Sequence, residues 1–214
     1  MYQPTNVLTS EAQLRDILPD QYPSQTGKVI DHIDEHIRVW IEHSPFLTMA
    51  TVSSAGQVDV SPKGDPAGFV KVLDEKTLAI PDRPGNHRFD SFLNIMQTGR
   101  IGLVFLVPNR REVVRVAGTA QVVRDIALRE QLAVNNKVPD FAVLVSVEEA
   151  FYHCGKAIIR SKLWEPEVAL PIDGIPSYAA AVKVHAELDD PVEEIDNLFQ
   201  MNEQYRLYDE QPEG

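Results

Sequence analysis

Apolar and polar residues alternate along most of the middle of the chain, and a period of two is typical of half-buried β-strands. Residues 54–56 and 74–76 each separate two such stretches, so we expect two antiparallel hairpins. Residues 100–107 are apolar enough to be buried on both faces, and Gly118 is expected to mark a β-bulge. Strands are predicted over residues 46–53, 57–61, 69–73, 77–80, 100–107, 112–124 and 141–152.

Helical spacing, with apolar residues three and four apart, occurs over residues 28–43 and 86–97. Asn86 is a natural N-cap for the second of these helices. Shorter helices are predicted over residues 9–18 and over residues 125–134, the latter capped by Asp125. Residues 165–176 are rich in proline and should be extended, whereas residues 177–209 are predicted to be helical with an acidic face.

This order of elements predicts a mainly β (α+β) fold, in which six or seven short antiparallel strands form a small barrel with a few flanking helices. A doubly wound sheet would need helices and strands in strict alternation, which the chain lacks. We expect residues 1–45 to be a helical segment packed on the barrel and residues 46–164 to be the barrel itself. Residues 165–214 would form an extended segment and an acidic helical tail.

The charge of the chain is concentrated near its C-terminus. The 214 residues carry a net charge of −12, and residues 187–214 account for −9 of it with ten acids and one base. Nucleic-acid binding needs a basic face for phosphate contacts, so we do not expect nucleic acid as a partner. No apolar run is long enough to span a membrane, no signal peptide is recognisable, and the single Cys154 allows no internal disulfide, so a cytoplasmic location is predicted.

Several common chemical signatures are missing. The chain has neither GxGxxG after a strand nor GxxxxGK[ST], so a nucleotide would not be held by a Rossmann or P-loop cradle. His32 and His36 lie four apart on a predicted helix, but Ile33 stands where a zinc protease needs glutamate, so no metal site is predicted. Cys154 is predicted to be a buried structural thiol, and no GxSxG motif supplies a serine nucleophile.

The strongest constellation joins the end of one predicted strand to the start of the second amphipathic helix. A helix N-terminus presents unpaired N–H groups and a partial positive charge, and nearby cations would complete an anion site suited to phosphate. An alternative stays open, in which the arginines only pair with Asp82 and Asp90 in a solvated turn. The residues concerned are Ser61, Lys63, Arg83, Asn86 and Arg88.

A second group of cations follows the last predicted strand. Lys156 and Arg160 would share one face of a helix, and Trp164 comes shortly after them. These residues could form a cationic and aromatic lip over a flat anionic ligand. They could equally be a solvated turn with Trp164 packed in a dimer seam, and both interpretations stay open.

These residues, in this order, resemble the pyridoxamine 5′-phosphate oxidase-like family of FMN-binding split barrels, and in particular an uncharacterised subgroup. The resemblance covers roughly residues 46–164 and rests on four blocks read together. They are FLTMATVSSAGQVDVSPKGD, IPDRPGNHRFDSFLNI, the strand pair IGLVFLVPN and VVRVAGTAQV, and FYHCGKAIIRSKLW.

The resemblance implies a homodimer with two FMN sites at the subunit interface. The expected contacts are Ser61 and Lys63 along the ring or the ribityl chain, the Ile80–Pro81–Asp82 segment at the ring edge, and Asn86 and Arg88 on the phosphate with Arg83 as a helper. Arg115, Lys156, Arg160 and Trp164 complete the expected cofactor contacts, Trp164 near the flavin of the other subunit.

The chain also departs from the family pattern. Val113 stands where a partner-chain glutamine is expected, and Trp164 is followed by EPEVALPIDG instead of an Arg-x-His substrate segment. Pyridoxamine phosphate oxidase activity itself is therefore not expected. The working hypothesis is an FMN-dependent oxidoreductase acting on an unknown small molecule, with no catalytic residue assigned.

Three alternatives remain open at this point. The same barrel could hold a deazaflavin or haem in place of FMN. The protein could be a flavin carrier or a structural dimer without turnover. The acidic tail could dock a partner protein.

Overall fold

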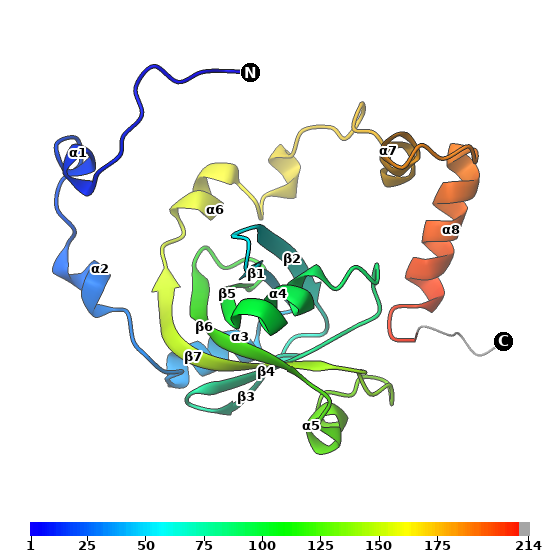
Figure 1. The fold of residues 1–214 in the computed structure, drawn as a ribbon, viewed down its shortest axis with the longest axis horizontal. Coiled ribbons are helices and arrows are strands. Elements are labelled where there is room, and N and C mark those ends of the chain that lie inside the picture. The colour runs from blue at the N-terminus through cyan, green and yellow to red at the C-terminus, as the bar shows by residue number, and fades with distance from the viewer. Residues whose placement is uncertain (210–214) are drawn as a thin grey trace.

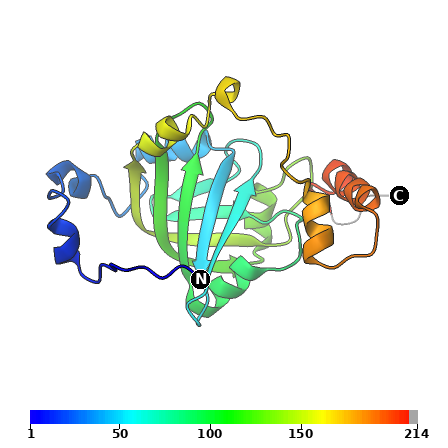
Figure 2. The same cartoon turned by 90° about the horizontal axis from the view of Figure 1, so that it is seen from above.

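Seven antiparallel strands form one curved sheet in the computed structural model, which describes residues 1–209 (Figures 1 and 2). The strand order is β2-β1-β5-β6-β7-β4-β3, and the edge strands β2 and β3 do not pair with each other, so the barrel is split. The fold is mainly β (α+β). The strands are β1 (Phe46–Val52), β2 (Val58–Gly64), β3 (Lys71–Asp74), β4 (Thr77–Pro81), β5 (Arg100–Leu106), β6 (Val113–Val123) and β7 (Ala142–His153).

All seven strands predicted from the alternating pattern are confirmed, with ends that shift by no more than three residues. The bulge expected at Gly118 is also confirmed, because the β6–β7 register shifts between Ala117 and Gly118. A bulge sharpens the local twist, which helps two long strands to curve around a barrel.

The helices predicted from apolar spacing are shorter than expected. Residues 28–43 do not form one helix, because Asp34 caps a new helix by accepting a hydrogen bond from the Ile37 N–H at 2.8 Å. Residues 177–209 form two helices, interrupted before Pro191. The helices are α1 (Glu11–Arg15), α2 (Pro23–Gly27), α3 (Glu35–Glu42), α4 (Asp90–Thr98), α5 (Ile126–Gln131), α6 (Lys156–Ser161), the 3₁₀ turn η1 (Pro166–Val168), α7 (Tyr178–His185) and α8 (Val192–Tyr205).

Helix α3 packs its apolar face against the barrel core. Ile37 and Ile41 are buried, and the buried Trp40 donates its indole N–H to the Phe105 carbonyl oxygen at 3.3 Å. Burial of three large side chains stabilises this contact by several kcal/mol, at roughly 1.5–3 kcal/mol for each. The indole hydrogen bond then fixes how the helix sits on β5.

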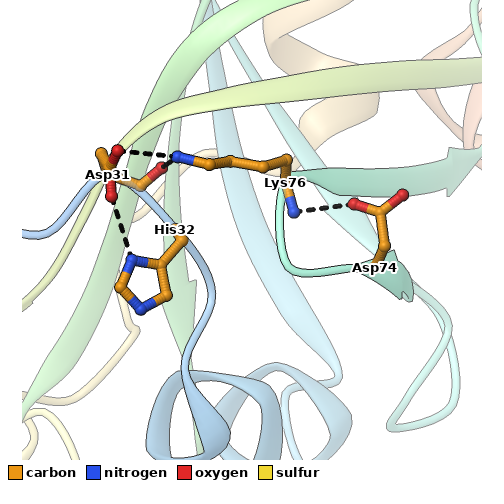
Figure 3. A network of polar contacts seen from close by, with 4 residues as sticks. All are labelled: Asp31, His32, Asp74 and Lys76. Carbon is orange, nitrogen blue, oxygen red and sulfur yellow. Dashed lines mark hydrogen bonds and ion pairs between the residues drawn. The ribbon is translucent and has the colours of Figure 1, made fainter.

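An ionic network ties the segment before α3 to the turn between β3 and β4 (Figure 3). The Asp31 carboxylate contacts Lys76 Nζ at 2.8 Å and His32 Nδ1 at 3.0 Å, and these hydrogen bonds lower the pKa of Asp31 to about 2. His32 therefore lies before α3 while His36 lies within it, so the expectation that they share a helix is wrong. Residues 1–209 hold no group of three or more side chains that could bind a metal ion.

The N-terminal helices α1 and α2 and the C-terminal helices α7 and α8 lie on opposite sides of the barrel (Figures 1 and 2). Residues 1–27, which include α1 and α2, are exposed throughout, so contact with the barrel begins with the segment that leads into α3. On the other side α7 and α8 pack together, with the Tyr178 and Phe199 rings stacked at 4.8 Å. Among residues 1–209, no helix combines the length and the apolar composition needed to cross a bilayer.

The buried Gly118 gives a direct test of the β6–β7 pairing. A Cβ atom at this position would collide with the Ser146 carbonyl oxygen, which belongs to the backbone of β7 and cannot move aside cheaply. We expect Gly118→Ala to destabilise the fold by about 1–3 kcal/mol in urea unfolding. Gly102→Ala on β5 is the matched control, because a Cβ atom there meets nothing within 4 Å. Equal midpoints for the two variants would contradict this register.

Candidate functional site

A cavity of about 500 Å³ lies where the edge strand β2 meets the start of α4 and the loop that follows β4. Its wall contains six of the predicted site residues. A volume of this size is within the range of cofactor sites, about 300–1,000 Å³. The six residues are Ser61, Lys63, Asp82, Arg83, Asn86 and Arg88.

Strand β2 contributes residues 59–63 to the wall of this cavity, and burial alternates along it. Asp59, Ser61 and Lys63 are half-buried, whereas Val60 and Pro62 between them are exposed. This is the period of two expected for a strand. Because β2 is an edge strand, it also tolerates Pro62, which cannot donate to a neighbouring ladder.

The loop that leads into α4 has an unusual backbone. His87 and Phe89 both have φ near 58°, a left-handed conformation that side chains other than glycine rarely adopt. Asn86 Oδ1 accepts a hydrogen bond from the Arg88 N–H at 3.1 Å, so Asn86 closes a local turn. The prediction that Asn86 is the helix N-cap is therefore wrong, because α4 begins after Phe89.

The real N-cap of α4 offers no side-chain acceptor. Phe89 makes no capping hydrogen bond, so the first-turn N–H groups of α4 lack the usual side-chain partner. Asp90, Ser91 and Phe92 of this first turn line the cavity. An uncapped helix start of this kind favours anions.

The two arginines of the loop have different environments. Arg83 donates from Nε to Asp65 Oδ2 at 2.6 Å and from Nη2 to the Leu132 carbonyl oxygen at 2.8 Å. The Arg83 side chain is 14% exposed and that of Asp65 only 1%, so this ion pair is internal. Arg83 was expected to pair with Asp82 if it did not bind a ligand, and that expectation is wrong.

Arg88 is held much more loosely than Arg83. It pairs with Asp90 at 2.7 Å, as the alternative interpretation of the loop expected, and its side chain is 72% exposed. Solvent screens an exposed pair of this kind, so it contributes little and a ligand could replace Asp90 at little cost. Arg88 is therefore the more available of the two guanidinium groups.

The cavity wall is of mixed charge and is not purely cationic. Ser91 Oγ donates to Asp59 Oδ2 at 2.6 Å, which engages one of the acids. Burial raises the pKa of Asp82, although the charges of Lys63 and Arg83 oppose the rise. The basic residues of the wall are Lys63, Arg83 and Arg88, and the acidic ones are Asp59, Asp82, Asp90 and Asp140.

The segment expected at the ring edge has few free backbone donors. Ile80 is 1% exposed within β4. Pro81 has no N–H, and the Asp82 N–H already donates to the Phe141 carbonyl oxygen at 3.0 Å. Hydrogen-bond donation to a ligand here would have to come from side chains such as Lys63.

The remaining predicted residues lie at the other end of the β6–β7 ladder. Arg115 places its guanidinium 5.1 Å from the centre of the Phe151 ring. Lys156 and Arg160 are exposed on α6, and Trp164 Nε1 donates to the Arg110 carbonyl oxygen at 2.7 Å. Strand β7 separates this group from the cavity, because it begins beside β4 and ends just before α6 (Figure 1).

Several residues of the cavity were missed by sequence reasoning. Asp59 alternates with Ser61 and Lys63, so the strand period could have identified it. Ser91, Asp140 and Phe141 come from other elements, and no local pattern marks them. The expectation for Cys154 is also wrong, because its thiol is exposed.

The burial of the Asp82 carboxyl group can be tested through the pH dependence of the protein's stability. Its raised pKa means that the folded state holds the proton more tightly than the unfolded chain does. Protonated Asp82 makes its full contribution to the free energy of unfolding below the ordinary carboxyl pKa of about 3.9. This contribution is lost as the pH rises through the raised pKa of the folded state.

We therefore expect Asp82→Asn to gain stability relative to the parent protein as the pH rises through that window, with a constant difference above it. Urea unfolding from about pH 4 to about pH 7 measures the difference. Glu149→Gln, which removes an exposed carboxylate on β7 that does not line this cavity, is the control. Parallel pH profiles for parent and Asp82→Asn would contradict the burial of this carboxyl group.

Comparison with solved structures finds proteins of similar architecture. HupZ from Group A Streptococcus is 22% identical, with 56% of this chain and 93% of HupZ covered and a TM-score of 0.47. A candidate pyridoxamine 5′-phosphate oxidase from Lactobacillus delbrueckii is 24% identical, with coverage of 57% and 95% and a TM-score of 0.45. HutZ, the heme storage protein from Vibrio cholerae, is 12% identical, with coverage of 57% and 94% and a TM-score of 0.41.

The comparison of sequences is more specific. No curated protein matches the chain. Residues 33–154 match the family described as pyridoxamine 5′-phosphate oxidase, and this span covers more than half of the chain and all seven strands of the sheet. The chain therefore belongs to the pyridoxamine 5′-phosphate oxidase family.

Proposed function

We propose that the cavity between β2, the β4–α4 loop and α4 binds FMN, and that the protein is a flavin-dependent oxidoreductase acting on a small molecule. The observation that carries the proposal is the convergence of Lys63, Arg88 and an uncapped helix start on one cavity of about 500 Å³. Members of this family generally bind flavin, which supports the same cofactor class.

The phosphate of FMN fits the α4 end of the cavity. The first-turn N–H groups of α4 lack a side-chain cap, and Arg88 stands at the same corner in a weak, exposed ion pair. A phosphate could take the place of the Asp90 carboxylate on Arg88 and form charge-assisted hydrogen bonds. Arg83 lines the same cavity but is paired with the buried Asp65, so it positions the loop and leaves the phosphate contact to Arg88.

The ring end of the site would depend on Lys63 and Asp82. The Lys63 side chain lies on the cavity face of β2, and its ammonium can donate to a carbonyl or stabilise negative charge on a bound ring. Asp82 lies close to Lys63 on the same cavity wall, and burial raises the pKa of its carboxyl group. When bound, FMN supplies hydride-transfer chemistry, and the chain contributes binding, orientation and electrostatics.

We further propose that the working unit is a homodimer. Arg115, Lys156, Arg160 and Trp164 lie at the far end of β7, and within one chain they line no part of this cavity. A second copy of the chain would be needed to bring them to it, and proteins of this family commonly form dimers.

One observation favours haem as a second candidate. His87 lines the cavity, and imidazole is a common axial ligand of haem iron.

The visible spectrum of the freshly purified protein separates these candidates. Flavin bands with FMN released on denaturation support the proposal, a Soret band supports haem, and the mass of the released cofactor identifies a deazaflavin. A colourless protein that binds no added FMN would refute the flavin assignment, and NAD(P)H oxidation by the loaded protein separates enzyme from carrier.

Arg88 gives a quantitative prediction. Arg88→Ala should weaken FMN binding by about 1.5–3 kcal/mol, or about 10–150-fold in Kd, because it removes a charge-assisted hydrogen bond to the phosphate. Riboflavin lacks the phosphate, so its affinity should change little in the same variant. Fluorescence titration with both ligands measures the difference.

Arg100→Ala is the matched control for this experiment. Arg100 pairs with Glu148 at 3.0 Å on the exposed surface of the barrel, much as Arg88 pairs with Asp90, but it does not line the cavity. Its removal should leave FMN affinity unchanged. If Arg88→Ala affects FMN and riboflavin equally, Arg88 does not contact the phosphate.

A further inference from the structure

The last described residues of the chain return to the barrel and contact the wall of the candidate flavin cavity. After α8, the Tyr208 hydroxyl donates to Asp65 Oδ1 at 2.8 Å, and the Tyr208 ring lies 5.6 Å from the Arg83 guanidinium. The next residue, Asp209, forms an ion pair with Lys137 at 2.5 Å. The chain thus leaves the barrel at α6, passes through α7 and α8, and comes back at a different place (Figures 1 and 2).

Tyr208 completes the surroundings of a buried carboxylate. Asp65 accepts from Arg83 through one oxygen and from Tyr208 through the other, and its side chain is only 1% exposed. The hydrogen bond to Asp65 raises the pKa of Tyr208, which keeps the hydroxyl protonated and able to donate. A buried carboxylate that loses one of two partners is costly, so Tyr208 and Arg83 depend on each other.

Residues 82–84 form a partition between two cavities. Asp82 and Arg83 line the candidate flavin cavity on one side, and on the other side they line a second cavity of about 370 Å³ together with Pro84. Tyr208 and Asp209 belong to the wall of this second cavity. The C-terminal segment therefore supports the partition from behind.

We propose that Tyr208 and Asp209 form a strap that holds this partition in place, and that release of the strap opens the flavin cavity to its ligand. The proposal deepens the function proposed above and rests on it. It needs no new contact between the strap and the ligand, because Arg83 and Asp82 connect the two.

The contacts that hold the strap are partly exposed, so the strap can dock on the barrel and can also detach from it. The Lys137–Asp209 pair is partly exposed, with side-chain exposures of 42% and 31%, and such pairs contribute little. Neither Tyr208 nor Asp209 is fully buried, and α8 ends at Tyr205 just before them. Segments with few buried apolar contacts open locally without global unfolding.

The experiment compares FMN association and dissociation rates in the full-length parent protein and in Tyr208→Ala, measured by stopped-flow fluorescence. A strap that gates the cavity limits both directions, so its loss should raise the dissociation rate about tenfold and the association rate as well. Tyr208→Phe, which keeps the ring beside Arg83 but removes the donor to Asp65, should give a smaller increase. Tyr205→Ala, an exposed tyrosine at the end of α8, should change neither rate.

Asp209→Asn keeps the proposal testable if Tyr208→Ala does not fold. It leaves the Asp65–Tyr208 hydrogen bond intact and weakens the ion pair to Lys137, so we expect both rates to rise by about twofold. Unchanged rates in every folded variant would overturn the strap. Faster dissociation with unchanged or slower association would also overturn the proposal. That result would mean that the strap only stabilises bound FMN and does not control its entry.

Failure of the flavin assignment can be recognised separately. If the parent protein binds no FMN, amide hydrogen exchange of residues 82–88 still compares the parent with Tyr208→Ala. Faster exchange in the variant, with Tyr205→Ala as control, would support docking of the strap on the partition. Equal exchange would overturn it.

Discussion

The pairing of β6 with β7 is the constraint on which the rest of this structure depends. These are the two longest strands, with 11 and 12 residues, and their ladder runs from Val113–His153 at one end to Val123–Ala142 at the other. Strand β4 and the candidate cavity adjoin one end of β7, and α6 follows the other end. Because a strand advances about 3.3 Å per residue, this ladder keeps the two groups of predicted site residues apart within one chain. The pairing therefore explains why a complete site, if it includes both groups, requires a second copy.

Two arginines only five positions apart have distinct roles because their burial differs. Arg83 neutralises an almost fully buried carboxylate, and breaking such a pair typically costs about 3–5 kcal/mol, so this residue is part of the architecture. Arg88 is mostly exposed and can exchange Asp90 for another anion at little cost. The buried arginine fixes the loop, and the exposed one is available to a ligand. The same fixed arginine also connects the loop to Tyr208 at the end of the described chain.

Much of this fold could be predicted from sequence, because burial alternates locally along each strand. Every strand was found in this way, and so was the bulge at Gly118, where only glycine fits against the backbone of β7. The start of α4 was predicted at the wrong residue. His87 and Phe89 adopt left-handed backbone conformations there, which residues other than glycine rarely do. The Asp65–Arg83 pair was also missed, because its members follow different strands and meet only when β2 and β4 are placed in the barrel. For the site, the sequence was a better guide to the residues that line the cavity than to the hydrogen-bond and ion-pair partners of those residues.

The mixed charge of the cavity wall bears on how an anion could be held there. Three basic and four acidic side chains line the cavity, so attraction at long range cannot account for the binding of a phosphate. Local geometry would have to do so, through the uncapped N–H groups of α4 and a guanidinium whose present partner is solvent-exposed. Acids elsewhere in the wall, such as the exposed Asp140 beside Asp82, would disfavour a phosphate at the ring end. A ligand with one anionic end and one flat, hydrogen-bonding end would therefore have a single preferred orientation, with its phosphate at α4 and its ring between Lys63 and Asp82.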